Sequence, residues 1–168
     1  MCRRRRKEGL WARSEDAPEY QLLPASRGPT GRPRICNSAD MVIQIGRHLT
    51  GAEKRQMRMQ EFFGAVALNN KNEILGLRIV AVGAANGCMV NPVDVFRYLL
   101  ETTACRWAAF HNHPSGDPTP SPDDVALTRR LQEAGKLMGL QLLEHVITGP
   151  EMSPDNYTSL RDSGILVG

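Results

Sequence analysis

Two histidines separated by one residue, His111 and His113, follow a short apolar segment of the chain. If that segment is a strand, its side chains alternate between two faces, so both imidazoles point to the same side. Two such imidazoles can bind one zinc ion, whose bonds to histidine nitrogen are about 2.0–2.1 Å long. Pairs of this kind also arise by chance, so a third ligand is needed before the pair indicates a metal site.

Asp124 can supply the third ligand. Seven residues rich in proline separate His113 from Ser121, and Ser121 to Asp124 begin a helix with an apolar stripe. The helix dipole stabilises a carboxylate in its first turn, and the loop can return that carboxylate to the histidines. Two histidines, a carboxylate and a water form the open arrangement of a catalytic zinc site. A purely structural alternative exists, because Ser-x-x-Asp before a helix is also a capping box.

The elements that would position these residues follow from apolar spacing, turn residues and caps. A short helix is expected after Asn37 or Ser38 and ends at Gly51. The remaining elements are strands at Glu61–Leu68 and Ile74–Val82, a helix from Pro92 to Thr103, a strand with the apolar run Trp107–Phe110 that ends at His111, a helix from Ser121 to Gly139, and a strand at Leu140–Thr148. A hairpin followed by alternating helices and strands predicts an α/β sandwich around a mixed sheet.

The spacing of the candidate ligands resembles a known family. His-x-His, seven residues, Ser, two residues and Asp match the signature of the JAMM (MPN, or JAB domain) zinc metalloproteases at His111, His113, Ser121 and Asp124. The stretch from His111 to Ser121 looks like the RadC branch of that family, and the similarity extends over residues 38–165. The resemblance implies a cytidine-deaminase-like three-layer sandwich and a zinc-dependent hydrolase of peptide or isopeptide bonds.

The resemblance also assigns roles to two further residues. The family requires a glutamate at the start of the first strand, and Glu61 occupies the matching place, although by itself it is an ordinary carboxylate. Glu61 would take a proton from the attacking water and deliver it to the leaving amine. Ser121 would donate a hydrogen bond to the oxyanion. RadC-like chains usually carry Asp-His in the last strand, where this chain has Glu144 and His145; we interpret His145 as a satisfied core residue.

Charge divides the chain of 168 residues unevenly. Residues 1–35 hold nine basic and four acidic residues, whereas residues 36–168 hold twelve and fourteen. The low apolar content and many prolines of the first segment predict a disordered basic tail at 1–37, followed by one domain at 38–168. No apolar run reaches the roughly 18–20 residues of a membrane span, and the N-terminus lacks the apolar core of a secretory signal. Four scattered cysteines indicate reduced thiols, so we expect a cytoplasmic protein with no membrane partner.

Other functions are compatible with parts of the sequence. The main alternative is a non-catalytic accessory protein of DNA repair, suggested by the RadC resemblance. The mildly acidic domain and the lack of a recognisable helix-hairpin-helix segment give direct DNA binding little support. A His-Asn-His nuclease would need a different frame around the metal, and a zinc nucleobase deaminase would need a Cys-x-x-Cys pair that is missing. We therefore expect a peptide or protein substrate and Zn²⁺ as cofactor.

Overall fold

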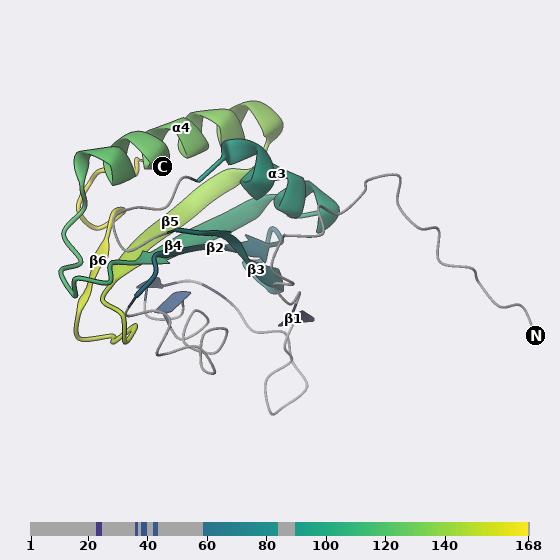
Figure 1. The fold of residues 1–168 in the computed structure, drawn as a ribbon. Helices are drawn as coiled ribbons and strands as arrows, with labels where there is room; N and C mark the ends of the chain where they lie inside the picture. The colour runs from purple at the N-terminus through teal and green to yellow at the C-terminus, as the bar shows by residue number, and fades with distance from the viewer. Residues whose placement is uncertain are drawn as a thin grey trace, which may run out of the picture.

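The structure is a computed structural model, and it describes residues 23–24, 36, 38–39, 42–43, 59–83 and 90–167. These residues form a six-stranded sheet and two helices (Figure 1). The elements in chain order are β1 (Leu23–Pro24), β2 (Phe62–Leu68), β3 (Ile74–Val82), α3 (Pro92–Glu101), β4 (Arg106–Asn112), α4 (Pro122–Met138), β5 (Gln141–Thr148) and β6 (Tyr157–Ser159).

The sheet is mixed, with strand order β1-β3-β2-β4-β5-β6. β2 pairs antiparallel with both β3 and β4, β4 pairs parallel with β5, and β5 pairs antiparallel with β6. A parallel pair needs a long crossover, and α4 supplies it between β4 and β5. The chain therefore leaves the C-terminal end of β4, turns back, and begins α4 near that same end of the strand. This connection positions the candidate site.

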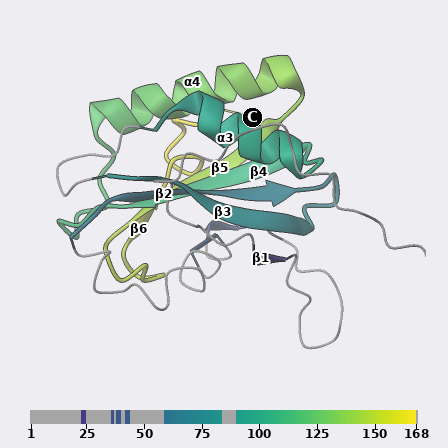
Figure 2. The ribbon, with the colours of Figure 1, turned by 45° about the vertical axis from the view of Figure 1, so that its right-hand side comes forward.

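Helices α3 and α4 cover one face of the sheet in both views (Figures 1 and 2). Alternate residues of β2 belong to two different cores, because side chains alternate along a strand. Phe63, Ala65 and Ala67 pack beneath the helices. Phe62, Val66 and Leu68 face the opposite side, where buried residues of a third layer cover them; these are Cys36, Ala39, Val42 and Ile43. The prediction of a three-layer α/β sandwich around a mixed sheet is confirmed.

Most of the predicted elements agree with the structure, and β3 has the predicted bounds. β4 is longer than predicted and runs through Asn112, because it is paired on both sides, with Phe63 opposite His111 and Thr148 opposite Asn112. Helix α3 ends at Glu101 instead of reaching Thr103, whose φ of 58° lies in the left-handed region. Pairing with β2 on one side and β5 on the other thus extends β4 beyond its apolar residues. The left-handed backbone at Thr103 ends α3 earlier than predicted.

Part of the predicted N-terminal organisation lies outside the described residues. Ala39, Val42 and Ile43 are helical, as predicted, but the rest of that short helix is not described. Within the predicted tail, Leu23 and Pro24 pair with Leu77 and Gly76 of β3. The disorder of residues 1–37 as a whole stays a prediction. Among the parts of the chain that are described, no helix is both long and apolar enough to cross a membrane.

Candidate metal site

Strand β4 brings the two histidines to the same side of the sheet. His111 is the penultimate residue of the strand and is 1% exposed, while His113 directly follows the strand and its side chain is 17% exposed. The backbone of His113 remains tied to the sheet, because its N–H donates to the carbonyl of Thr148 at 2.8 Å. The central position of β4 therefore holds both imidazoles firmly, with His113 nearer to solvent.

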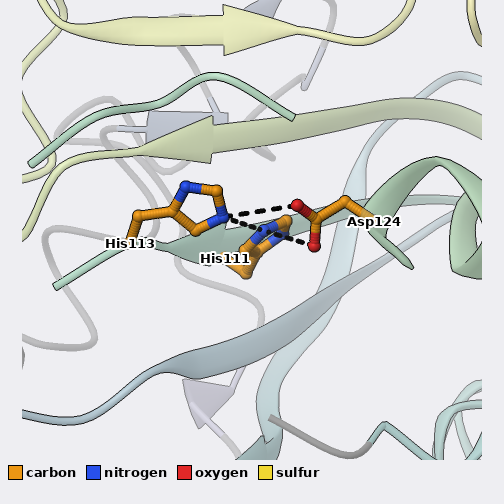
Figure 3. Close-up of side chains that lie close together, drawn as sticks. All are labelled: His111, His113 and Asp124. Atoms are coloured by element: carbon orange, nitrogen blue, oxygen red, sulfur yellow. Dashed lines mark hydrogen bonds and ion pairs between the residues drawn. The ribbon is translucent and has the colours of Figure 1, made fainter. Parts of the chain in front are cut away.

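Helix α4 brings Asp124 to the histidines. Gly116, with a φ of 88°, turns the loop after His113, and Ser121 then caps the helix. The predicted capping box is present: the Ser121 hydroxyl accepts from the Asp124 N–H at 3.2 Å, and the Asp124 carboxylate accepts from the Ser121 N–H at 2.7 Å. The capping box fixes the direction of the Asp124 side chain, and this carboxylate faces both imidazoles (Figure 3).

The distances between these three side chains suit a metal ion. His111 Nε2 lies 3.2 Å from Asp124 Oδ1, His113 Nε2 lies 3.4 Å from Asp124 Oδ2, and the two Nε2 atoms are 3.1 Å apart. Two atoms bonded at about 2.0–2.1 Å to one tetrahedral ion lie about 3.3–3.4 Å from each other. The three candidate ligand atoms all lie within 4.8 Å of one another. Two imidazoles and one carboxylate, a donor set typical of zinc sites, can therefore hold a metal ion here.

Hydrogen bonding shows which atom His113 offers to the site. Its Nδ1 lies 2.7 Å from the carbonyl oxygen of Asp117. A carbonyl only accepts, so Nδ1 carries the proton, and in the neutral ring Nε2 carries the lone pair. That lone pair faces His111 and the Asp124 carboxylate, and such a group of acceptors requires a cation or a proton between them.

The charges of the site agree with this requirement. Burial would raise the pKa of Asp124, but the adjacent imidazoles of His111 and His113, together with the Ser121 hydroxyl, hold that pKa well below its usual range. The hydrogen bond with Asp124 raises the pKa of His113 above its ordinary value, although burial opposes the shift. The first shift favours the charged form of the carboxylate, and the second favours the charged form of the imidazole beside it.

His145 lies behind His111, on the neighbouring strand β5. It is 0% exposed, and its Nε2 lies 2.8 Å from His111 Nδ1. Its Nδ1 lies 2.7 Å from the hydroxyl of Thr128, which donates to the carbonyl of Asp124 at 2.6 Å. Burial lowers the pKa of His145 well below its ordinary value. The sequence predicted that His145 is a buried residue with its hydrogen bonds satisfied, and it is. One of its hydrogen-bond partners is the candidate ligand His111, which the sequence did not predict.

Glu144 does not contact the ring of His145. Its carboxylate accepts from the backbone N–H of His145 at 2.8 Å and from the Ser159 hydroxyl at 2.9 Å, and burial raises its pKa. The acidic residue of the Glu-His pair therefore joins β5 to β6. Sequence reasoning missed Thr128 as a neighbour of the site. Its spacing of four residues from Asp124 was the available signal, because such residues share one helix face.

Glu61 precedes β2 at the same edge of the sheet. Its backbone is fixed, because its carbonyl accepts from the N–H of Gly83 at 2.8 Å. Burial raises the pKa of its carboxyl group, while His111 and His113 lower it and Asp124 raises it. The carboxylate therefore lies within electrostatic range of all three candidate ligands, but it is not a member of the close group that they form.

Ser121 also touches the site, but through Asp124. Its hydroxyl donates to Asp124 Oδ2 at 2.6 Å, so its proton is committed to a candidate ligand. The structure gives Ser121 its capping role and a contact that orients the carboxylate. Its donation to an oxyanion stays a prediction. For that role, the hydroxyl must break its hydrogen bond to Asp124 and donate to the substrate instead.

Comparisons with known proteins agree with this arrangement. The RadC-like JAB domain family matches residues 36–165. The chain is 38% identical over 150 residues to a UPF0758 protein of Desulfitobacterium hafniense, covering 89% of this chain and 62% of that protein. It is 38% identical over 148 residues to the UPF0758 protein YsxA of Bacillus subtilis, with coverages of 87% and 62%. The chain thus spans about three-fifths of the length of these two relatives. The matched range contains every residue of the candidate site, and the chain belongs to the RadC-like JAB domain family.

Proposed function

We propose that this chain is a zinc-dependent hydrolase of peptide or isopeptide bonds, with His111, His113 and Asp124 as the metal ligands. The observation that carries the proposal is the convergence of two imidazole nitrogens and a carboxylate: the two Nε2 atoms lie 3.1 Å apart, and each lies 3.2–3.4 Å from one oxygen of Asp124. Three protein ligands leave a fourth position open, which distinguishes catalytic from structural zinc sites.

The residues around the ligands have the properties that hydrolysis needs. When bound, zinc polarises a carbonyl group and lowers the pKa of water at the site. Glu61 is the proposed general base, because it occupies the place of the family's glutamate and its carboxyl group lies within electrostatic range of the three candidate ligands. Substrate reaches the site from the His113 side, since the side chain of His113 is 17% exposed and that of His111 only 1%.

The first experiment measures zinc per chain in the purified protein. We expect about one zinc in the wild type and a large loss in His113→Ala and Asp124→Asn. Asp123→Asn is the matched control, because Asp123 lies in the same first turn of α4 but outside the group of candidate ligands. Zinc well below one per chain after gentle purification, and unchanged by His111→Ala, would refute the site.

A second experiment tests the reaction. The zinc-loaded wild type is incubated with a library of peptides and isopeptide-linked conjugates, and cleavage is followed by mass spectrometry. Cleavage that depends on Glu61 supports the proposal. A zinc-loaded chain that cleaves nothing but binds DNA in a salt-dependent manner would instead support a role as an accessory protein.

A further inference from the structure

Three buried hydrogen bonds connect the main chain of Asp124 to the side chain of His111. Thr128 Oγ1 lies 2.6 Å from the Asp124 carbonyl oxygen and 2.7 Å from His145 Nδ1, and His145 Nε2 lies 2.8 Å from His111 Nδ1. Thr128 and His145 are 0% exposed. The chain of contacts therefore lies in the protein interior and ends on the ring nitrogen of His111 that faces away from Asp124.

The carbonyl at one end sets the direction of the whole chain. A carbonyl oxygen only accepts, so the single hydroxyl proton of Thr128 is donated to Asp124. Thr128 has no second proton, and at 2.7 Å it must therefore accept a hydrogen bond from His145 Nδ1. His145 thus carries a proton on Nδ1.

The other ring nitrogen of His145 is then an acceptor. The hydrogen-bond partners of the two ring nitrogens of His145 are a hydroxyl and an imidazole, and a buried imidazolium without a contacting carboxylate is strongly disfavoured. In the neutral ring, Nε2 carries a lone pair and accepts from His111 Nδ1. His111 consequently holds its proton on Nδ1 and presents an unprotonated Nε2 toward His113 and Asp124.

We propose that Thr128 and His145 are positioning residues that fix His111 in the tautomer able to bind a metal ion. The purpose of this arrangement rests on the proposed function, because only a metal ligand needs a free Nε2. Asp124 then acts twice: its carboxylate is a ligand, and its carbonyl determines through Thr128 and His145 which nitrogen His111 offers. In other metal sites, residues that hydrogen-bond to the second ring nitrogen of a ligating histidine also fix its tautomer and orientation.

The tautomer is measured directly in metal-free wild-type protein. Long-range proton–nitrogen correlation spectra distinguish a ring nitrogen that bears a proton from one that does not. At a pH well above the ordinary histidine pKa, we expect the proton of His111 on Nδ1 and that of His145 also on Nδ1. A His111 that carries its proton on Nε2 overturns the proposal, whether or not the protein binds zinc.

Variants test the two positioning residues. Thr128→Val removes the hydroxyl at nearly constant shape, and we expect a mixed His111 tautomer with zinc affinity lowered about 10–100-fold. Thr128→Ser and His145→Gln keep the donor and acceptor pattern and should stay close to the wild type. Thr148→Val is the matched control, because the Thr148 hydroxyl is also buried and also donates to a carbonyl, that of Gly149, outside this chain of bonds.

The outcomes separate this inference from the proposed function. A wild type with the expected tautomer that binds no zinc refutes the metal function and supports the tautomer assignment. Thr128→Val and Thr128→Ser with equal spectra and equal zinc affinity overturn the assignment. If Thr128→Val does not fold, the wild-type spectrum still decides the question.

Discussion

Asn112 binds the chain on both sides of Glu61. Its side-chain oxygen accepts from the Phe62 N–H at 2.9 Å, and its side-chain nitrogen donates to the Gln60 carbonyl at 3.1 Å. Asn112 is 1% exposed and is the middle residue of the His-x-His sequence. The residue between the two candidate ligands therefore fixes the backbone of the proposed general base relative to them.

Replacing Asn112 with alanine should lower the free energy of unfolding by about 1–3 kcal/mol, because the buried Phe62 N–H loses its acceptor. Zinc binding should persist, since β4 keeps its backbone pairing with β2 and β5. Urea unfolding and zinc titration measure the two effects. The control is Asn156→Ala, which removes one exposed bond to Gly116 and should change stability by less than about 0.5 kcal/mol. Equal stability losses in both variants would contradict the bridging role of Asn112.

Glu61→Gln should separate catalysis from metal binding. Glutamine keeps the shape and the hydrogen bonding but cannot act as a base, so turnover should fall about 10²–10⁴-fold while zinc remains bound. Asp124→Asn should weaken zinc binding and also the start of α4, where its carboxylate completes the capping box. Zinc content and turnover of both variants are compared with the wild type. Loss of zinc from Glu61→Gln equal to that from Asp124→Asn would make Glu61 a ligand.

Ser121 variants distinguish the cap from the oxyanion role. Ser121→Ala removes the acceptor for the Asp124 N–H and should cost about 0.5–2 kcal/mol of stability. Ser121→Thr retains a hydroxyl and should restore most of that loss. Oxyanion donation predicts a turnover loss in Ser121→Ala that persists under conditions where the variant is fully folded. Turnover equal to the wild type under those conditions would leave Ser121 with its structural role alone.

Zinc should stabilise the folded protein by mass action. At a free zinc concentration about 100 times the dissociation constant, the gain is about 2.7 kcal/mol. The melting temperature should therefore rise with added zinc and fall with a chelator. Asp124→Asn should lose most of this response and Asp123→Asn should keep it. A melting temperature that responds equally in both variants would show that the ion binds elsewhere.

Cys36 should be unreactive in the native protein. It is 3% exposed, and burial, with the nearby Glu144, raises the pKa of its thiol to about 12. The thiolate is the nucleophile, so alkylation should be slow at neutral pH and accelerate as the pH rises toward that value. Cys105, which is partly exposed, is the internal reference. Peptide mass spectrometry measures both sites, and equal native labelling rates would show that Cys36 is not packed against the sheet.

Local rules were sufficient for most of the central elements and for the choice of candidate ligands, but they did not predict β1 or β6. A turn at 69–72, in which the Asn72 N–H donates to the Asn69 carbonyl at 2.9 Å, separates β2 from β3. Gly139 ends α4 in the left-handed conformation, and Ser121 with Asp124 forms the predicted capping box. These features depend on residues close together in the chain, where propensity and capping act directly. The spacing of His111 and His113 likewise fixed their common side, because strand alternation is itself local.

The tertiary structure alone decided what surrounds those ligands. His145 reaches His111 across 34 residues of sequence, and Asn112 reaches Gln60 across 52. The first contact depends on the register that places Ala109 opposite His145 in the parallel pair of β4 and β5. An apolar pattern shows which face of a strand is buried but not which residue of another strand lies beside it. The sequence therefore determined the identity of the candidate ligands, and the sheet register determined which buried partners orient them.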